Sequence, residues 1–166
     1  MVREALENDI EGIARVWIAA WRWAYASVLP ADFIEARCDL GRRMDNARAD
    51  LSRGRMLVVD EEGVQGFARA LVPSSRAGFD AEISGLYVHP DASRKGVGHA
   101  LVRAMAGEFL HQGCRSMAIQ TLRDNAIGRG FYEKIGGDLV GTDEWSGFPC
   151  VWYGWDEARL VRLARS

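Results

Sequence analysis

The chain has 166 residues, the size of one ordinary domain, and we expect a single domain covering residues 1–166. Its 21 basic and 23 acidic residues give a formal net charge of −2, so the composition provides no general attraction to nucleic acid. No apolar run is long enough to cross a bilayer, and the N-terminus has no signal-peptide pattern. We therefore expect a soluble, cytoplasmic protein without a nucleic-acid or membrane partner.

The three cysteines are far apart in the sequence and show no Cys-x-x-Cys spacing. This pattern favours neither a disulfide framework nor a zinc site, so we expect reduced, mostly buried thiols at Cys38, Cys114 and Cys150. The three histidines show no metal-ligand spacing either, and we expect no metal.

The first third of the chain predicts a strand followed by helices. Residues 2–5 are a short strand candidate, and Asn8 with Glu11 three positions later is typical of a helix N-cap with a capping box. Apolar residues then recur at steps of three and four up to Trp21, which predicts one buried helical face. A second helical region covers residues 31–53 with a break near residues 39–41, and its interspersed arginines are expected to form a solvated face.

A hairpin and a polar loop come next. Residues 56–59 and 64–72 are apolar runs joined by Glu61, Glu62 and Gly63, which predicts two strands and a tight turn. Residues 73–80 are the longest polar loop of the chain. This loop either borders a pocket or only connects two strands.

Residues 82–101 are the stretch around which we expect the chain to be organised. An apolar run ends at His89 and Pro90, a short polar loop follows, and Gly96 and Gly98 open a segment with helical apolar spacing. Such a junction directs several free backbone N–H groups and the positive end of a helix dipole at one place. Because glycine lets an anion approach the main chain, the junction predicts a phosphate site.

The rest of the chain alternates helices and strands. The helix that begins near Gly98 is expected to end at Gly113. The further elements are a strand at 116–122, a helix from Asn125 to Gly136, two strands at 138–142 and 150–155 around a loop at 143–149, and a terminal helix capped by Asp156. This order is an α/β layer pattern with a mixed sheet.

Two common nucleotide motifs do not fit the glycine loop. The dinucleotide fingerprint requires a third glycine where Leu101 stands, and the P-loop requires Gly-Lys-Ser/Thr. The run Arg94-Lys95-Gly96-Val97-Gly98-His99, preceded by Leu86-Tyr87-Val88-His89-Pro90, instead resembles the acetyl-CoA motif of the GNAT superfamily of N-acetyltransferases. One position departs from that motif, because Ser93 stands where the family has Arg or Gln.

A second motif about thirty residues later strengthens the resemblance. Residues 125–136, from Asn125 through Phe131 and Tyr132 to Gly136, resemble the family's Asn-x-x-Ala-x-x-Phe/Leu-Tyr-x-Lys-x-Gly. Gly128 replaces the usual Ala, and Gly137 replaces the usual Phe that follows. The order of elements also agrees, so the resemblance implies a GNAT-type α/β fold with a mixed, mostly antiparallel sheet flanked by helices.

The resemblance implies transfer of the acetyl group of acetyl-CoA, as co-substrate, to a primary amine by direct attack in a ternary complex. It assigns Glu82 as general base and Tyr132 as general acid, although a strand-edge carboxylate and a core tyrosine are the structural alternatives. The cofactor would be held by residues 94–99 (Arg94, Lys95, Gly96, Val97, Gly98 and His99) and by Leu86, Tyr87, Val88 and Asn125.

The acceptor is the least defined part of this hypothesis. Trp21 and Tyr25 near the end of the first helix, and Trp145 and Phe148 in the loop at 143–149, are more aromatic surface than packing explains, so we expect them at the pocket for a small-molecule or peptide amine. A sensor that binds acetyl-CoA without catalysis is the alternative within this fold. An interaction protein is a third alternative, but it leaves the glycine loop unexplained. The sequence leaves open whether the protein forms a homodimer.

Overall fold

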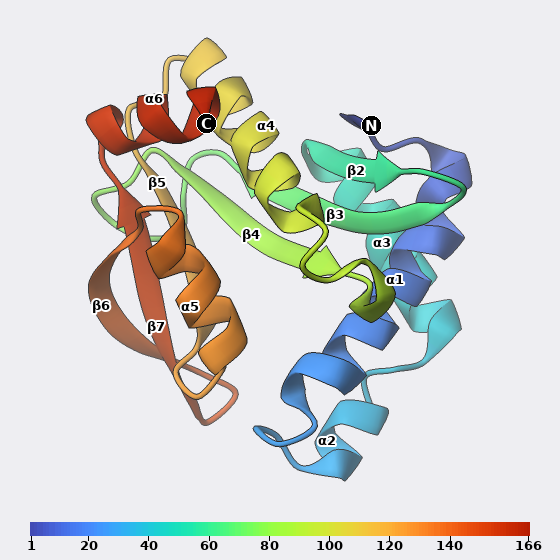
Figure 1. Cartoon of the computed structure of the whole chain (residues 1–166). Helices are drawn as coiled ribbons and strands as arrows, with labels where there is room; N and C mark the ends of the chain where they lie inside the picture. The colour runs from blue at the N-terminus through green and yellow to red at the C-terminus, as the bar shows by residue number, and fades with distance from the viewer. The chain divides into compact units, whose positions relative to one another are not determined.

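The computed structural model describes residues 1–166, and the chain divides into two compact units. The N-terminal unit comprises residues 1–69 and 85–101, and the C-terminal unit comprises residues 70–84 and 102–166. Strand β4 (Ala81–Val88) and helix α4 (Val97–His111) each contribute to both units. Figure 1 shows the succession of elements along the chain.

The strands form one seven-stranded sheet in the order β1-β2-β3-β4-β5-β7-β6. The pairs β1–β2, β2–β3, β5–β7 and β6–β7 are antiparallel, and β4–β5 is parallel. The predicted α/β class with a mixed, mostly antiparallel sheet is therefore confirmed. That residues 1–166 form a single domain stays a prediction.

The N-terminal unit is built from three antiparallel strands and three helices. Strands β1 (Val2–Glu4), β2 (Met56–Asp60) and β3 (Val64–Leu71) form the predicted hairpin and its neighbour. Helix α1 (Ile10–Tyr25) buries the predicted apolar face, including Trp17 and Trp21. The second helical region divides as expected into α2 (Ala31–Glu35) and α3 (Leu40–Arg53), because the Asp39 carboxylate accepts a hydrogen bond from the Arg42 amide at 2.7 Å and caps α3.

The start of α1 differs from the prediction. Asn8 lies inside a 3₁₀ turn, Glu7–Asp9, and does not cap the helix. The carboxylate of Asp9 instead accepts a hydrogen bond from the Leu6 amide at 2.8 Å. The prediction of a capping box at Asn8 was therefore wrong, because Asp9 is fixed by a partner outside the Asn8–Glu11 spacing on which that prediction was based.

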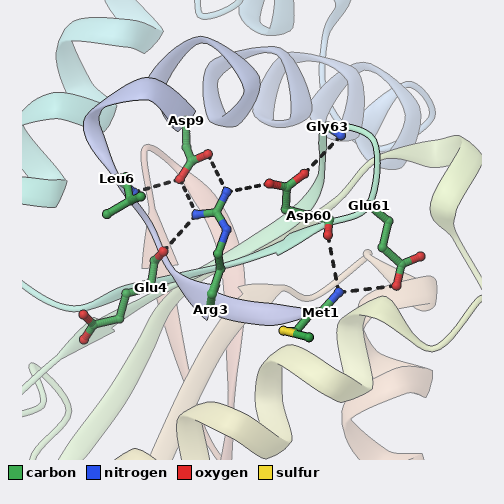
Figure 2. Close-up of polar contacts among 8 residues, drawn as sticks. All are labelled: Met1, Arg3, Glu4, Leu6, Asp9, Asp60, Glu61 and Gly63. Carbon is green, nitrogen blue, oxygen red and sulfur yellow. Dashed lines mark hydrogen bonds and ion pairs between the residues drawn. The ribbon is translucent and has the colours of Figure 1, made fainter.

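That partner is Arg3, which joins three segments of the N-terminal unit (Figure 2). Its guanidinium donates two hydrogen bonds to Asp9, at 2.7 and 2.9 Å, and one to Asp60 at 2.6 Å. Asp60 also accepts from the Gly63 amide at 3.1 Å, in the turn between β2 and β3. Arg3 thus ties β1 to the start of α1 and to the hairpin turn.

Besides its parts of β4 and α4, the C-terminal unit contains two whole helices and three whole strands. Strand β5 (Met117–Leu122) pairs along its whole length with β7 (Phe148–Trp155), whose residues from Cys150 to Trp155 are all buried. Helix α5 (Ala126–Lys134) follows β5, and helix α6 (Glu157–Arg165) is capped as predicted by Asp156, which accepts from the Arg159 amide at 2.9 Å.

The predicted loop at residues 143–149 is wrong. Strand β6 (Asp138–Trp145) continues to Trp145, which pairs directly with Phe148 of β7. Only Ser146 and Gly147 form the turn, with φ of +50° and +82°. Two consecutive left-handed residues make the tight hairpin turn whose twist matches antiparallel strands, so no longer loop is needed.

The three thiols are buried, as the sequence predicts. Burial raises the pKa of the Cys38, Cys114 and Cys150 thiols above their ordinary value. Among the helices, none has both the length and the apolar character needed to span a bilayer.

Replacing Asp9 by Asn should lower the free energy of unfolding at pH 7 by about 1–3 kcal/mol, because a buried site loses charge-assisted hydrogen bonds. The hydrogen bond from Arg3 holds the pKa of Asp9 below its ordinary value. The carboxylate therefore stabilises the fold fully above the unfolded-state pKa of about 3.9 and loses this effect as the pH falls through the lower folded-state pKa. Urea unfolding of wild type and Asp9→Asn should show a difference that shrinks below about pH 4.

Glu61→Gln is the matched control, because this exposed carboxylate pairs only with the N-terminal amine, at 3.4 Å. We expect no measurable change in the free energy of unfolding. A difference between wild type and Asp9→Asn that stays constant from pH 7 to pH 2 would show that the Asp9 charge does not stabilise the fold.

Candidate active site

The glycine loop has the geometry of an anion site. After β4 ends, the His89 amide donates to the Gln65 carbonyl at 2.8 Å, and the loop then turns through Gly96 at a φ of +86°. The first hydrogen bond at the start of α4 runs from the Ala100 amide to the Gly96 carbonyl at 2.9 Å. The amides of residues 96–98 therefore have no acceptor within the helix.

The space beside this loop is open. A Cβ built on Gly96 would meet no atom within 4 Å, so the glycine is required by its positive φ and not by crowding. Arg94 also has a positive φ, of +61°, and its side chain is exposed like that of Lys95. Free amides, a helix N-terminus and two nearby cationic side chains suit a phosphate group.

Glu82 is buried, and only one of its two carboxylate oxygens accepts hydrogen bonds. Its side chain is 7% exposed, and its residue pairs with Ala118 of β5. Oε2 accepts from the amide and hydroxyl of Ser75, at 3.0 and 2.7 Å, and from the hydroxyl of Ser74 at 3.4 Å. All three hydrogen bonds reach the same oxygen, so the carboxylate has a fixed orientation and its Oε1 is not used.

Ser74 and Ser75 were not predicted as site residues. They lie in the polar loop at residues 73–80, for which the sequence left open a pocket wall or a simple connection. The structure favours a positioning role, since this loop holds Glu82. The sequence signal was the Ser-Ser pair eight and seven residues before a glutamate at the start of a buried strand.

Tyr132 lies on α5 and is 7% exposed. Its ring lies 5.5 Å from that of Phe131, 5.7 Å from Tyr153 and 6.5 Å from Trp155. The hydroxyl of Tyr153 in turn donates to Glu133 at 2.6 Å and accepts from Arg129 at 3.0 Å, which fixes α5 on β7. Packing therefore sets the direction of the Tyr132 side chain.

Asn125 is the N-cap of α5. Its Oδ1 accepts from the Gly128 amide at 3.1 Å, and its Nδ2 donates to the hydroxyl of Thr121 at 3.1 Å. A Cβ on Gly128 would lie 2.6 Å from Nδ2 of Asn125, so an alanine at this position would require the Asn125 amide to shift. The cap accounts for Asn125 structurally, and its contact with a cofactor stays a prediction.

The second departure from the motif also has a physical reason. Trp155 is fully buried and donates its indole N–H to the Ile135 carbonyl at 3.1 Å. A Cβ on Gly137 would lie only 2.6 Å from the Trp155 ring. The ring of Trp155 therefore fills the space next to residue 137, where a phenylalanine would not fit.

The aromatic residues of α1 form a continuous row. Trp17 stacks on Trp21 with ring centroids 4.3 Å apart, and Trp21 meets Tyr25 edge-on at 4.9 Å. Trp21 is 6% exposed, whereas Tyr25 is partly exposed. Core packing thus explains most of the burial of the Trp21 side chain. Tyr25 is the member of the row that is better placed to contact a ligand.

The predicted site residues fall into two groups. The glycine loop, Tyr87 and the α1 row belong to the N-terminal unit, while Glu82, Tyr132 and Trp145 belong to the C-terminal unit. Leu86, Val88 and His99 are partly exposed residues on β4 and α4. Trp145 is partly exposed beside the β6–β7 turn, not in a loop.

Comparison with known families identifies one match. Residues 14–137 match the model of the Acetyltransferase (GNAT) family. The matched range begins in α1 and ends after α5, so it includes the glycine loop, Glu82 and Tyr132.

Individual relatives agree with that match. The uncharacterized N-acetyltransferase YuaI of Bacillus subtilis is 31% identical over 126 residues, which cover 75% of this chain and 72% of YuaI. The PaiA N-acetyltransferase of Thermoplasma acidophilum, solved with coenzyme A, is 19% identical with a TM-score of 0.75, over 93% of this chain and 98% of that one. The YncA acetyltransferase of Salmonella typhimurium, solved with acetyl-CoA, is 20% identical with a TM-score of 0.68, over 95% and 93% of the two chains.

Proposed function

Because the chain belongs to the GNAT acetyltransferase family, we propose that it transfers the acetyl group of acetyl-CoA to a primary amine by direct attack in a ternary complex. Family membership supports acetyl transfer with acetyl-CoA as co-substrate. The amine acceptor, the direct attack and the residue roles are the proposal. The observation that carries it is the buried Glu82 carboxylate, held through one oxygen.

The glycine loop binds the pyrophosphate of acetyl-CoA in this proposal. The free amides of residues 96–98 and the start of α4 support an anion there, and Arg94 and Lys95 add positive charge. Leu86, Tyr87 and Val88 follow the same strand toward the loop, where backbone groups bind the pantetheine arm and polarise the acetyl carbonyl. Asn125 supports this arm from the start of α5.

Glu82 acts as the general base. A primary alkyl amine with a pKa of about 10.4 is unprotonated in only about one molecule in a few thousand at neutral pH, so a group must accept its proton, directly or through water. Three hydrogen bonds fix Oε2 of Glu82 and leave Oε1 to take that proton. Ser75 is then a positioning residue.

Tyr132 returns a proton to the thiolate of coenzyme A. The position of the phenol, and not its acidity, suits it to donate this proton. Packing against Phe131, Tyr153 and Trp155 supports that position. The other tyrosine nearby, Tyr153, has its hydroxyl bonded to Glu133 and Arg129, and burial raises its pKa. The buried cysteines, whose pKa values burial raises, are poor nucleophiles for an acetyl-enzyme route.

The acceptor is a small-molecule or peptide amine that contacts Tyr25, with Trp21 and Trp145 as further members of its pocket. We place this reaction in the cytoplasm and in one domain spanning residues 1–166. The alternative, a sensor that binds acetyl-CoA without turnover, gives no role to the oriented Glu82 carboxylate.

Gly98→Val should weaken coenzyme A binding by about tenfold or more, about 1.4 kcal/mol, because its side chain stands where the phosphate approaches. Calorimetric titration measures the affinity. Gly107→Val is the matched control, because Gly107 lies in the same helix and a Cβ there meets nothing within 4 Å. Equal affinities of both folded variants for coenzyme A would move the phosphate site elsewhere.

Glu82→Gln and Tyr132→Phe should each lower kcat by about a hundredfold to ten-thousandfold while coenzyme A affinity changes little, as expected for lost proton transfer. The loss in Glu82→Gln should be smallest at high pH, where the amine is already unprotonated.

Ser75→Ala should lower kcat less than Glu82→Gln, since it removes a support of the carboxylate and not the carboxylate itself. Unchanged turnover of Tyr132→Phe would leave the phenol as a core residue and water as the proton source.

A further inference from the structure

Arg43 departs from the solvated arginine face that the sequence predicts for the helical region at residues 31–53. Arg42, Arg48 and Arg53 are exposed, whereas Arg43 is partly buried. The centre of its guanidinium lies 4.2 Å from the centroid of the Trp17 ring. Its Nε is buried and has no hydrogen-bond partner. This side chain therefore packs into the N-terminal unit without a bonded acceptor.

No carboxylate pairs with Arg43. On the same helix, Arg48 pairs with Glu7 at 2.9 Å, and the nearby Arg69 pairs with Asp50. The positively charged neighbours that act on Arg43 are Arg42 and Arg69. Burial, together with these two arginines, lowers the pKa of Arg43. Because Asp50 neutralises Arg69, the excess positive charge at this site comes from Arg43 and Arg42.

A partly buried and unpaired guanidinium is unfavourable unless something compensates it. Stacking on Trp17 contributes about 0.5–2 kcal/mol, but it satisfies none of the N–H groups. The planar fork of a guanidinium matches the two oxygens of a carboxylate. The arrangement is therefore suited to bind a carboxylate against an aromatic face.

The position of Arg43 relates it to the proposed acceptor. Trp17, on which it stacks, is the first member of the row that continues through Trp21 to Tyr25. Trp17 also lies 6.0 Å from the ring of Tyr87 on β4. Arg43 and Tyr25 are therefore the two ends of one continuous series of ring contacts.

We propose that the acceptor is an amine that also carries a carboxylate, and that Arg43 binds this carboxylate over Trp17. This inference rests on the proposed function, since it defines the acceptor of that same site. An amino acid has the required pair of groups, whereas a polyamine or a simple alkylamine does not. Arg43 is then a specificity-determining residue and takes no part in proton transfer.

Two readouts test this inference with matched pairs of ligands: L-phenylalanine and phenethylamine, L-lysine and cadaverine, and L-methionine and 3-(methylthio)propylamine. The first readout is tryptophan fluorescence during titration of each ligand into the protein with coenzyme A, because Trp17 lies under the guanidinium. The second is kcat/KM for each ligand with acetyl-CoA. Wild type should bind and acetylate at least one amino acid at least tenfold better than its decarboxylated partner.

Arg43→Met should remove this preference by raising KM for the amino acid at least tenfold, with no change for the simple amine or for acetyl-CoA. Arg43→Lys, which keeps the positive charge but not the two parallel N–H donors of the guanidinium, should retain part of the preference for the amino acid. Arg53→Met is the control on the same helix, and its exposed side chain should leave every value unchanged. Circular dichroism confirms that the variants are folded.

The outcomes separate the two proposals. Carboxylate-selective binding that Arg43→Met abolishes, without turnover of any ligand, would uphold the carboxylate site at Arg43 and overturn acetyl transfer to these amines. Turnover of simple amines at the same efficiency as amino acids, or a preference that survives in Arg43→Met, would overturn this inference and leave acetyl transfer intact. Absence of both binding and turnover for every pair would overturn both.

Discussion

Strand β4 is the constraint on which the rest of the structure depends, because both units are built on it. Its first half is almost completely buried, with exposures of 0% for Ala81, 7% for Glu82 and 1% for Ile83. These residues belong to the C-terminal unit, and residues 85–88 belong to the N-terminal unit. The strand therefore carries the proposed base as its second residue and ends shortly before the glycine loop, the proposed phosphate site.

Packing and chemistry reinforce each other in the C-terminal unit. Trp155 fills the space next to Gly137 and bonds the Ile135 carbonyl, so the end of α5 is fixed on β7. Tyr153 fixes the middle of the same helix through Glu133 and Arg129. The phenol of Tyr132 on α5 thus gains a defined direction from its packing, as its proposed role of proton donor requires.

Local patterns in the sequence were sufficient for most elements and for the two motifs. The strand, glycine turn and helix around Gly96 were predicted because their signals lie within twenty residues. The capping box at Asn8 failed because Glu7, Asn8 and Asp9 are locally similar, and only Arg3 decides which one is fixed. The hairpin at Ser146 and Gly147 failed because aromatic and polar residues around it suggested a loop, although two residues with positive φ suffice for the turn.

Long-range contacts account for what the sequence did not show in the site. The bonds from Ser74 and Ser75 to Glu82 depend on how an eight-residue loop returns to the strand that follows it. The stacking of Arg43 on Trp17 joins two helices separated by α2, and arginines spaced among carboxylates indicated only a solvated surface. The resemblance to family motifs predicts neither contact, because both contacts depend on the tertiary structure.

The most direct test of direct acetyl transfer is the initial-velocity pattern with acetyl-CoA and an accepted amine, both varied. Attack in a ternary complex predicts double-reciprocal lines that intersect, because both substrates must be bound before the first product leaves. Intact-protein mass after incubation with acetyl-CoA alone should show no stable acetyl adduct. Parallel lines together with an acetylated cysteine would contradict the account, and the buried thiols would then have to be accessible during turnover.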